Sequence, residues 1–153
     1  MSLNDYPFPP WENNHGVALL TLTILFSILS PTHAEEVSTA PSQVVGQWLQ
    51  SYPHDLTEAV TLTSLDFREN LSPDDWITQR ESILRQVRLQ YLDRQILNVG
   101  IDGNRAVIKV KVWISTILGE QIQLERYELS RYCSVWLLEK VSVIEERFLG
   151  HTM

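Results

Sequence analysis

A strictly alternating run near the middle of the chain most constrains what it can fold into. Apolar side chains occupy every second position from residue 106 to residue 114: Ala106, Ile108, Val110, Val112 and Ile114. The positions between them hold a mixed set: Val107, Lys109, Lys111 and Trp113. Because successive side chains of a strand point to opposite faces, this pattern predicts a strand with one buried face, as in an antiparallel sheet.

One more strand is predicted before this run, and another is predicted near the end of the chain. Leu97, Val99 and Ile101 alternate with their neighbours before a turn-forming stretch at residues 102–104, and a last strand is expected from about Val135 to Val143. Turn residues between alternating segments are typical of an antiparallel meander.

A further strand is expected between the alternating run at residues 106–114 and the last strand, and its apolar pattern has a break. Ile122 and Leu124 share one parity, whereas Tyr127 and Leu129 lie on the other. A β-bulge adds one residue to a strand and so switches its parity. We therefore expect a bulge near residues 125–126 that brings all four side chains to the same face.

Three helices are predicted before these strands. The first begins near Pro41, and its apolar residues are spaced along one helical face: Val44, Val45, Trp48, Leu49 and Tyr52. Asp55 and Ser72 are good N-cap residues, so they mark the starts of the second and third helices. Three helices followed by a curved antiparallel sheet make an α+β fold, which we expect over residues 41–148.

An uncharged apolar segment, residues 16–30, precedes this domain. Thr32 and Ala34 follow it as small residues at the −3 and −1 positions of a cleavage site, as in a secretory signal peptide. The run is short for a spanning helix, which needs about 20 apolar residues. Residues 1–15, however, contain no Lys or Arg, although a signal peptide normally begins with a positive region.

Three interpretations of residues 1–34 therefore stay open. A cleaved signal peptide is favoured, and the alternatives are an uncleaved anchor with a short tail and a hydrophobic helix of a soluble protein. The first makes the domain periplasmic or secreted, and the second tethers it to a membrane. In both cases residues 35–40 form a short polar linker to the domain.

Charge and residue usage exclude several classes of function. The net charge is −7 and no Lys or Arg cluster is present, which argues against a nucleic-acid partner. The four histidines lie far apart in the sequence, so no metal site is predicted. No glycine-rich phosphate loop is present either, and we expect no cofactor. Cys133 is the only cysteine, so no intrachain disulfide can form.

The element order and apolar pattern resemble the nuclear transport factor 2-like superfamily, also called the cystatin-like cone. The resemblance is carried by residues 41–49 (PSQVVGQWL), 62–68 (LTSLDFR), 103–107 (GNRAV), 125–129 (ERYEL) and 135–141 (VWLLEKV). It covers about residues 41–145 and rests on pattern, without an invariant signature. It implies a concave pocket, in a superfamily that contains isomerases and cyclases as well as binding and assembly domains.

Four aromatic residues are candidates for the lining of such a pocket, although aromatic residues also fill the cores of small domains: Trp48, Tyr52, Trp76 and Tyr127. An isomerase also needs a buried carboxylate. Glu139 is the candidate, because it shares parity with the apolar residues of the last strand. The favoured alternative places Trp136 and Leu138 inside and leaves Glu139 in solvent.

Trp113 shares its face with Lys109 and Lys111 rather than with the buried residues of its strand. An aromatic side chain on an outer sheet face is typical of an interface. We therefore expect a contact surface for a partner protein, or for a second copy of the chain, unless another segment covers this face.

Together these features favour a non-catalytic, extracytoplasmic binding or assembly domain that recognises a partner protein or a small apolar ligand. One alternative is a small isomerase or cyclase that uses Glu139 or another buried carboxylate. Another is a membrane-tethered component similar to secretion-system assembly domains.

Overall fold

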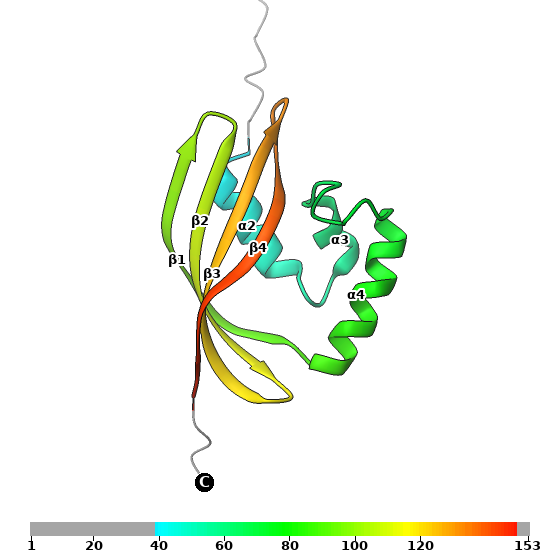
Figure 1. Ribbon diagram of the computed structural model, residues 1–153, viewed down its shortest axis with the longest axis vertical. Helices are drawn as coiled ribbons and strands as arrows, with labels where there is room; N and C mark the ends of the chain where they lie inside the picture. The colour runs from blue at the N-terminus through cyan, green and yellow to red at the C-terminus, as the bar shows by residue number, and fades with distance from the viewer. Residues whose placement is uncertain (1–38, 150–153) are drawn as a thin grey trace, which may run out of the picture. The chain divides into compact units, whose positions relative to one another are not determined.

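The computed structural model describes residues 39–149, which form three helices followed by four strands (Figure 1). The helices are α2 (Pro41–Ser51), α3 (Leu56–Thr61) and α4 (Pro73–Val87), and the strands are β1 (Gln90–Asp102), β2 (Arg105–Thr116), β3 (Gly119–Tyr132) and β4 (Val135–Phe148). The apolar segment at residues 16–30 lies outside the described residues, and none of the helices within residues 39–149 has the length and hydropathy to cross a membrane.

The helices begin where their capping residues predict. The Asp55 carboxylate accepts a hydrogen bond from the Glu58 N–H at 3.0 Å, and the Ser72 hydroxyl accepts one from the Asp75 N–H at 3.2 Å. Each bond satisfies a backbone donor that has no partner within the helix. The second helix ends at Thr61, so Phe67 lies in the α3–α4 loop.

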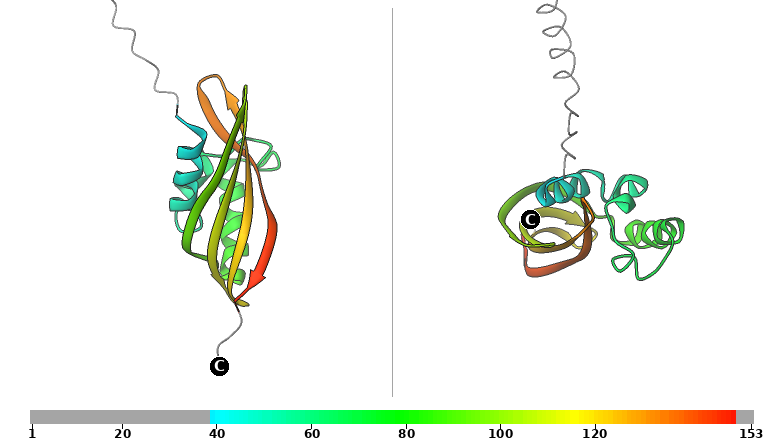
Figure 2. Two further views of the ribbon diagram at one scale, coloured as in Figure 1. Left: turned by 90° about the vertical axis from the view of Figure 1, so that its left-hand side faces the viewer. Right: turned by 90° about the horizontal axis from the view of Figure 1, so that it is seen from above.

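The strands form one antiparallel sheet in the order β1-β2-β3-β4, which confirms the predicted α+β class. The sheet curls strongly, and α2 lies against its inner face (Figure 2). The alternation of β2 is as predicted, since its inward apolar residues are all buried: Ala106, Ile108, Val110, Val112 and Ile114.

The other two helices stand beside the sheet (Figure 1). Helix α4 reaches the core through Trp76, which is buried. The segment after α3 joins the free edge of β4, where the Leu138 N–H donates to the carbonyl of Leu62 at 2.8 Å and the Leu138 carbonyl accepts from the Ser64 N–H at 2.9 Å. This pairing fixes the α3–α4 loop against the sheet.

The bulge expected near residues 125–126 of β3 is absent, and that prediction is wrong. β3 pairs with β2 in continuous register, so Ile122 and Leu124 stay on the outer face while Glu125 and Tyr127 point inward. The irregularities lie in β4 instead, which gains one extra residue opposite Leu124–Glu125 and another opposite Glu128–Leu129. Outward apolar residues are stable here because Ile122 lies directly across from Trp113 on β2.

Candidate ligand-binding site

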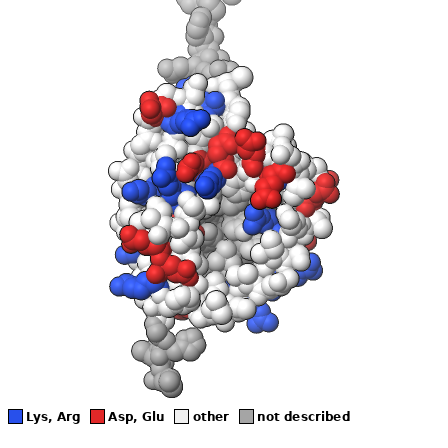
Figure 3. Space-filling view, viewed as in Figure 1, with Lys and Arg blue, Asp and Glu red and all other residues white. Residues whose placement is uncertain are grey.

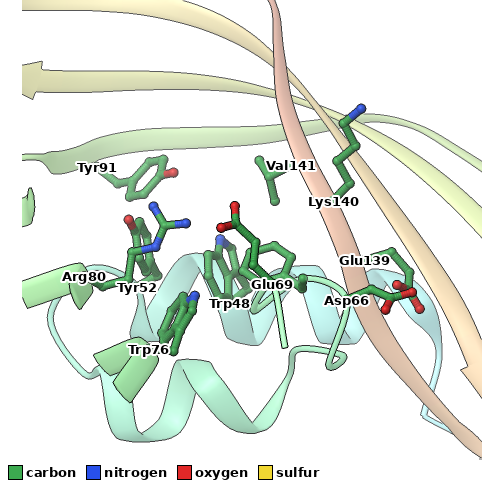
Figure 4. Close-up of a pocket in the computed structure, with 11 residues that line it drawn as sticks. Trp48, Tyr52, Asp66, Glu69, Trp76, Arg80, Tyr91, Glu139, Lys140 and Val141 are labelled. Atoms are coloured by element: carbon green, nitrogen blue, oxygen red, sulfur yellow. The ribbon is translucent and has the colours of Figure 1, made fainter. Parts of the chain in front are cut away.

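A cavity of about 380 Å³ opens between α2, α4, the α3–α4 loop and β4 (Figure 4). Its walls bring together residues that are distant in the sequence: Trp48, Tyr52, Asp66, Phe67, Glu69, Trp76, Arg80, Tyr91, Glu139, Lys140 and Val141. Pockets that bind small molecules have volumes from about 300 to 1,000 Å³, so this one fits a small ligand.

Aromatic rings form one side of the cavity. Trp48 and Tyr52 stack with their ring centroids 4.6 Å apart, and Phe67 meets the edge of Trp48 at 5.3 Å. Trp76 from α4 lies 6.3 Å from Trp48. Tyr52, the C-cap residue of α2, follows Trp48 by four positions, so both rings lie on the same face and form a rigid apolar wall beside the open space.

Two buried donors on this wall have no acceptor among the described residues: the Trp76 indole Nε1 and the Arg80 Nε. Trp76 is only 1% exposed. The Arg80 guanidinium lies over its ring, with the guanidinium carbon 5.5 Å from the ring centroid. An unpaired buried donor costs about 1–3 kcal/mol, so this place favours any molecule that supplies an acceptor.

Acidic residues of the α3–α4 loop also line the cavity. Asp66 and Glu69 are exposed on the α3–α4 loop, and Figure 4 shows Asp66 beside Glu139. In the space-filling view, acidic side chains lie above the hollow between β4 and α4, with Lys and Arg side chains among them (Figure 3). Charges of both signs therefore line the cavity, with Arg80 from α4 and the two carboxylates from the loop.

Glu139, the carboxylate singled out in the sequence, occupies the irregular stretch of β4. Its two oxygens accept hydrogen bonds from the Ser64 hydroxyl at 2.8 Å and the Tyr132 hydroxyl at 2.6 Å, and the second bond raises the pKa of Tyr132. Trp136 and Leu138 are the buried residues of this strand, as the favoured alternative predicts. Glu139 therefore lies at the rim of the cavity, with both oxygens engaged.

The carboxylate buried inside the sheet is Glu125, which the sequence did not single out. It is 5% exposed and lines a second, largely apolar cavity of about 360 Å³ at the β2–β3 end of the sheet. Burial raises the pKa of Glu125, and hydrogen bonds from the hydroxyls of Tyr127 at 2.5 Å and Tyr91 at 3.4 Å oppose that shift. Tyr91 lines both cavities and so stands between them.

Of the four predicted pocket residues, the structure places Trp48, Tyr52 and Trp76 together on the first cavity. Tyr127 is fully buried on the inner sheet face beside Glu125 and does not line that cavity. That these residues bind a ligand stays a prediction. Arg80 was missed, although its position four residues after Trp76 puts both side chains on one face of α4.

The predicted interface residues lie on the outer face of β2. Lys109 is exposed, whereas Trp113 is half-buried because the Lys111 ammonium lies 4.6 Å from its ring centroid and Ile122 lies across from it. A shallow hollow next to Lys111 is lined by Ile122 and Leu124 from β3. The outer face thus combines an apolar centre with charged neighbours.

Comparisons with known protein families and with curated proteins found no match. Among solved structures, a ketosteroid isomerase-like protein from Erwinia carotovora atroseptica is similar over 72% of this chain and 98% of its own, with a TM-score of 0.53 and 12% identity. A SEC-C motif containing protein from Rhodopseudomonas palustris has a TM-score of 0.51 and 14% identity over 69% of this chain and 80% of its own.

A protein of Bdellovibrio bacteriovorus is similar with a TM-score of 0.52 and 8% identity. That likeness covers 67% of this chain but only 39% of the Bdellovibrio protein, so the chain spans well under half of that protein's length. At such identities the likeness shows the fold alone. The chain shares its α+β fold with a ketosteroid isomerase-like protein.

Proposed function

We propose that this domain is a non-catalytic binding module whose small-molecule ligand occupies the cavity between α2, α4 and β4. The observation that carries this proposal is the pair of buried donors without an acceptor, Trp76 Nε1 and Arg80 Nε, on the wall of an aromatic cavity. A ligand with an apolar body and a carboxylate fits both features. Its body covers the rings, and its oxygens accept the two free hydrogen bonds.

The proposed site of action is outside the cytoplasm, because residues 16–30 have the composition of a signal peptide or an anchor. If the segment is not cleaved, the domain is tethered to a membrane and a role in an assembly is the alternative. N-terminal sequencing of the protein from its native host separates the two. A start at Glu35 supports export with cleavage, and full-length protein in the cytoplasmic fraction contradicts export altogether.

The second candidate is a proton-transferring isomerase or cyclase, and the observation that favours it is Glu125. A buried carboxyl with a raised pKa, bonded to Tyr127 and open to an apolar cavity, has the properties of a general acid or base. Glu125, rather than Glu139, is the residue to substitute in a search for such activity, because both oxygens of Glu139 already accept hydrogen bonds at the rim.

Phenylpropionate is a suitable first probe, since it combines an aromatic ring with a carboxylate. We expect it to quench the fluorescence of Trp48 and Trp76 in the full chain. A hydrogen bond to a charged group contributes about 1.5–3 kcal/mol, so Arg80→Gln and Trp76→Phe should each weaken binding by about tenfold or more.

Arg85→Gln is the matched control, since Arg85 is exposed on the same helix and does not line this cavity. It should bind phenylpropionate like the parent. The proposal is wrong if the parent does not bind the probe, or if binding is unchanged in both Arg80→Gln and Trp76→Phe.

A further inference from the structure

We infer that the ligand of this cavity is a zwitterion of the size of a free amino acid or a dipeptide, with an aromatic or large apolar side chain. Its carboxylate would contact Arg80 and Trp76, and its ammonium group would contact Asp66 and Glu69. This inference rests on the proposed function and narrows its ligand to one chemical class.

The first support is that charges of both signs line one cavity. Arg80 comes from α4, whereas Asp66 and Glu69 come from the α3–α4 loop, and all three line the same space. Within residues 39–149 the ion pair is Arg126–Glu128 on the outer sheet face, so Arg80 is not paired with either acid. A cavity lined by a cation and by carboxylates that form no ion pair with one another is complementary to a ligand that carries both a positive and a negative charge.

The second support is that the other charged residues at the rim are already occupied or turned away. Glu139 has both oxygens hydrogen-bonded to hydroxyls. Lys140 pairs across the sheet with Glu128, on the outer face, and Figure 4 shows its ammonium group pointing away from the rings. The charges left for a ligand are therefore one cation and two carboxylates.

The third support is the apolar wall beside these charged residues. The rings of Trp48, Tyr52 and Trp76 offer stacking surface for an aromatic side chain. The same rings also favour an ammonium group near their faces. With about 380 Å³ available, the cavity lies near the lower end of the usual range for ligand sites, which favours a small molecule.

Other ligand classes match fewer of these features. A polyanion such as a nucleotide would meet Arg80 but be repelled by Asp66 and Glu69, and an organic cation would meet the acids but be repelled by Arg80. A neutral apolar molecule would leave the Trp76 and Arg80 donors without an acceptor.

Three related probes test the inference by calorimetry on the full chain: phenylalanine, phenylpropionate, which lacks the ammonium group, and phenethylamine, which lacks the carboxylate. We expect phenylalanine to bind at least about tenfold more tightly than either analogue, since each analogue loses one charged contact. The double variant Asp66→Asn/Glu69→Gln should remove the advantage of phenylalanine over phenylpropionate. Both positions are exposed, so this variant is expected to fold.

The matched control is Glu58→Gln/Glu81→Gln, which makes the same change of charge at exposed positions outside this cavity and should keep the preference for phenylalanine. If phenylpropionate binds as tightly as phenylalanine, the zwitterion inference is wrong while the proposed function stands. If the double variant still binds phenylalanine more tightly than phenylpropionate, Asp66 and Glu69 are not the ammonium site. The zwitterion inference is then overturned as well. If none of the three probes binds, both proposals fail.

Discussion

The buried position of Glu125 could not be predicted from the pattern of the sequence. In the linear pattern it stands at a break between apolar residues, which favoured a bulge. In the folded chain it alternates regularly with its neighbours and points inward, where two tyrosine hydroxyls reach it. A carboxylate is buried only where hydrogen-bond donors compensate for its lost hydration, and one of those donors, Tyr91, comes from a strand distant in the sequence.

The raised pKa of Glu125 predicts a pH-dependent stability. Burial lifts its pKa above the usual 4.5, so between the two values the folded chain holds more protons than the unfolded chain. The free energy of unfolding therefore falls as pH rises through that range. Glu125→Gln carries no charge at any pH, so its stability relative to the parent should increase as the pH rises above 4.5.

Urea denaturation at several pH values measures this difference. Glu120→Gln, on the exposed end of the same strand, serves as the control and should follow the parent. A parent and a Glu125→Gln variant whose stabilities change in parallel with pH would show that Glu125 titrates normally in the fold.

The residues of the candidate site differ in how far the sequence reveals them. Trp48 and Trp76 were found because helical spacing marks apolar positions that face the protein interior. Arg80 was not found, because a charged residue on a helix is usually solvated and only the packing of α4 places it over Trp76. The spacing of apolar residues shows which face of a helix is buried. It does not show which residues of other elements pack against that face, because this depends on the tertiary structure.

At the scale of elements, α2 carries the clearest stability prediction. Trp48 is 3% exposed and contacts aromatic residues from the C-cap of α2, the α3–α4 loop and α4. Trp48→Ala should lower the free energy of unfolding by about 3–5 kcal/mol, because it removes a large buried ring and leaves a void. Gln47→Ala, at an exposed position on the same helix, should have little effect in the same urea titration. Equal stability of the two variants would contradict the assigned face of α2.

The strands were predicted unequally for a physical reason. β2 has an apolar residue at every inward position, so its parity is unambiguous. In the first half of β3, three polar side chains point inward: Gln121, Gln123 and Glu125. Two apolar side chains, Ile122 and Leu124, point outward. The inner face there borders a cavity, where polar side chains bond to one another, as Gln123 does to Gln121 at 3.1 Å. In this half of β3 the alternating apolar residues therefore lie on the outer face. In most strands the alternating apolar residues lie on the buried face.

For the whole molecule, the outer sheet face is where we expect contact with a partner, and a second copy of the chain is the occupant to test first. Trp113 lies beside Ile122 within a face that carries charges of both signs, including the pair of Arg126 and Glu128 at 3.3 Å. Truncating an interface anchor costs about 2 kcal/mol or more of binding. Trp113→Ala should therefore keep a near-native melting temperature but shift a dimer to monomer in sedimentation.

Val107→Ala, on the same face towards the other end of β2, is the control and should leave the oligomeric state unchanged. If Trp113→Ala unfolds the domain, the tryptophan belongs to the fold rather than to an interface. If the parent sediments as a monomer at every concentration, self-association through this face is excluded.

The pairing of Leu138 with the segment after α3 has a consequence for how such molecules can associate. It occupies the hydrogen-bonding groups along part of the free edge of β4, so another strand cannot add there without displacing residues 62–64. The opposite edge, β1, is interrupted by irregular pairing at Leu92 and Leu97. Neither edge offers a straight, open ladder, which is how natural sheets resist edge-to-edge aggregation. Growth of this sheet from one chain to the next, as in a fibril, is therefore opposed at both ends by the fold itself.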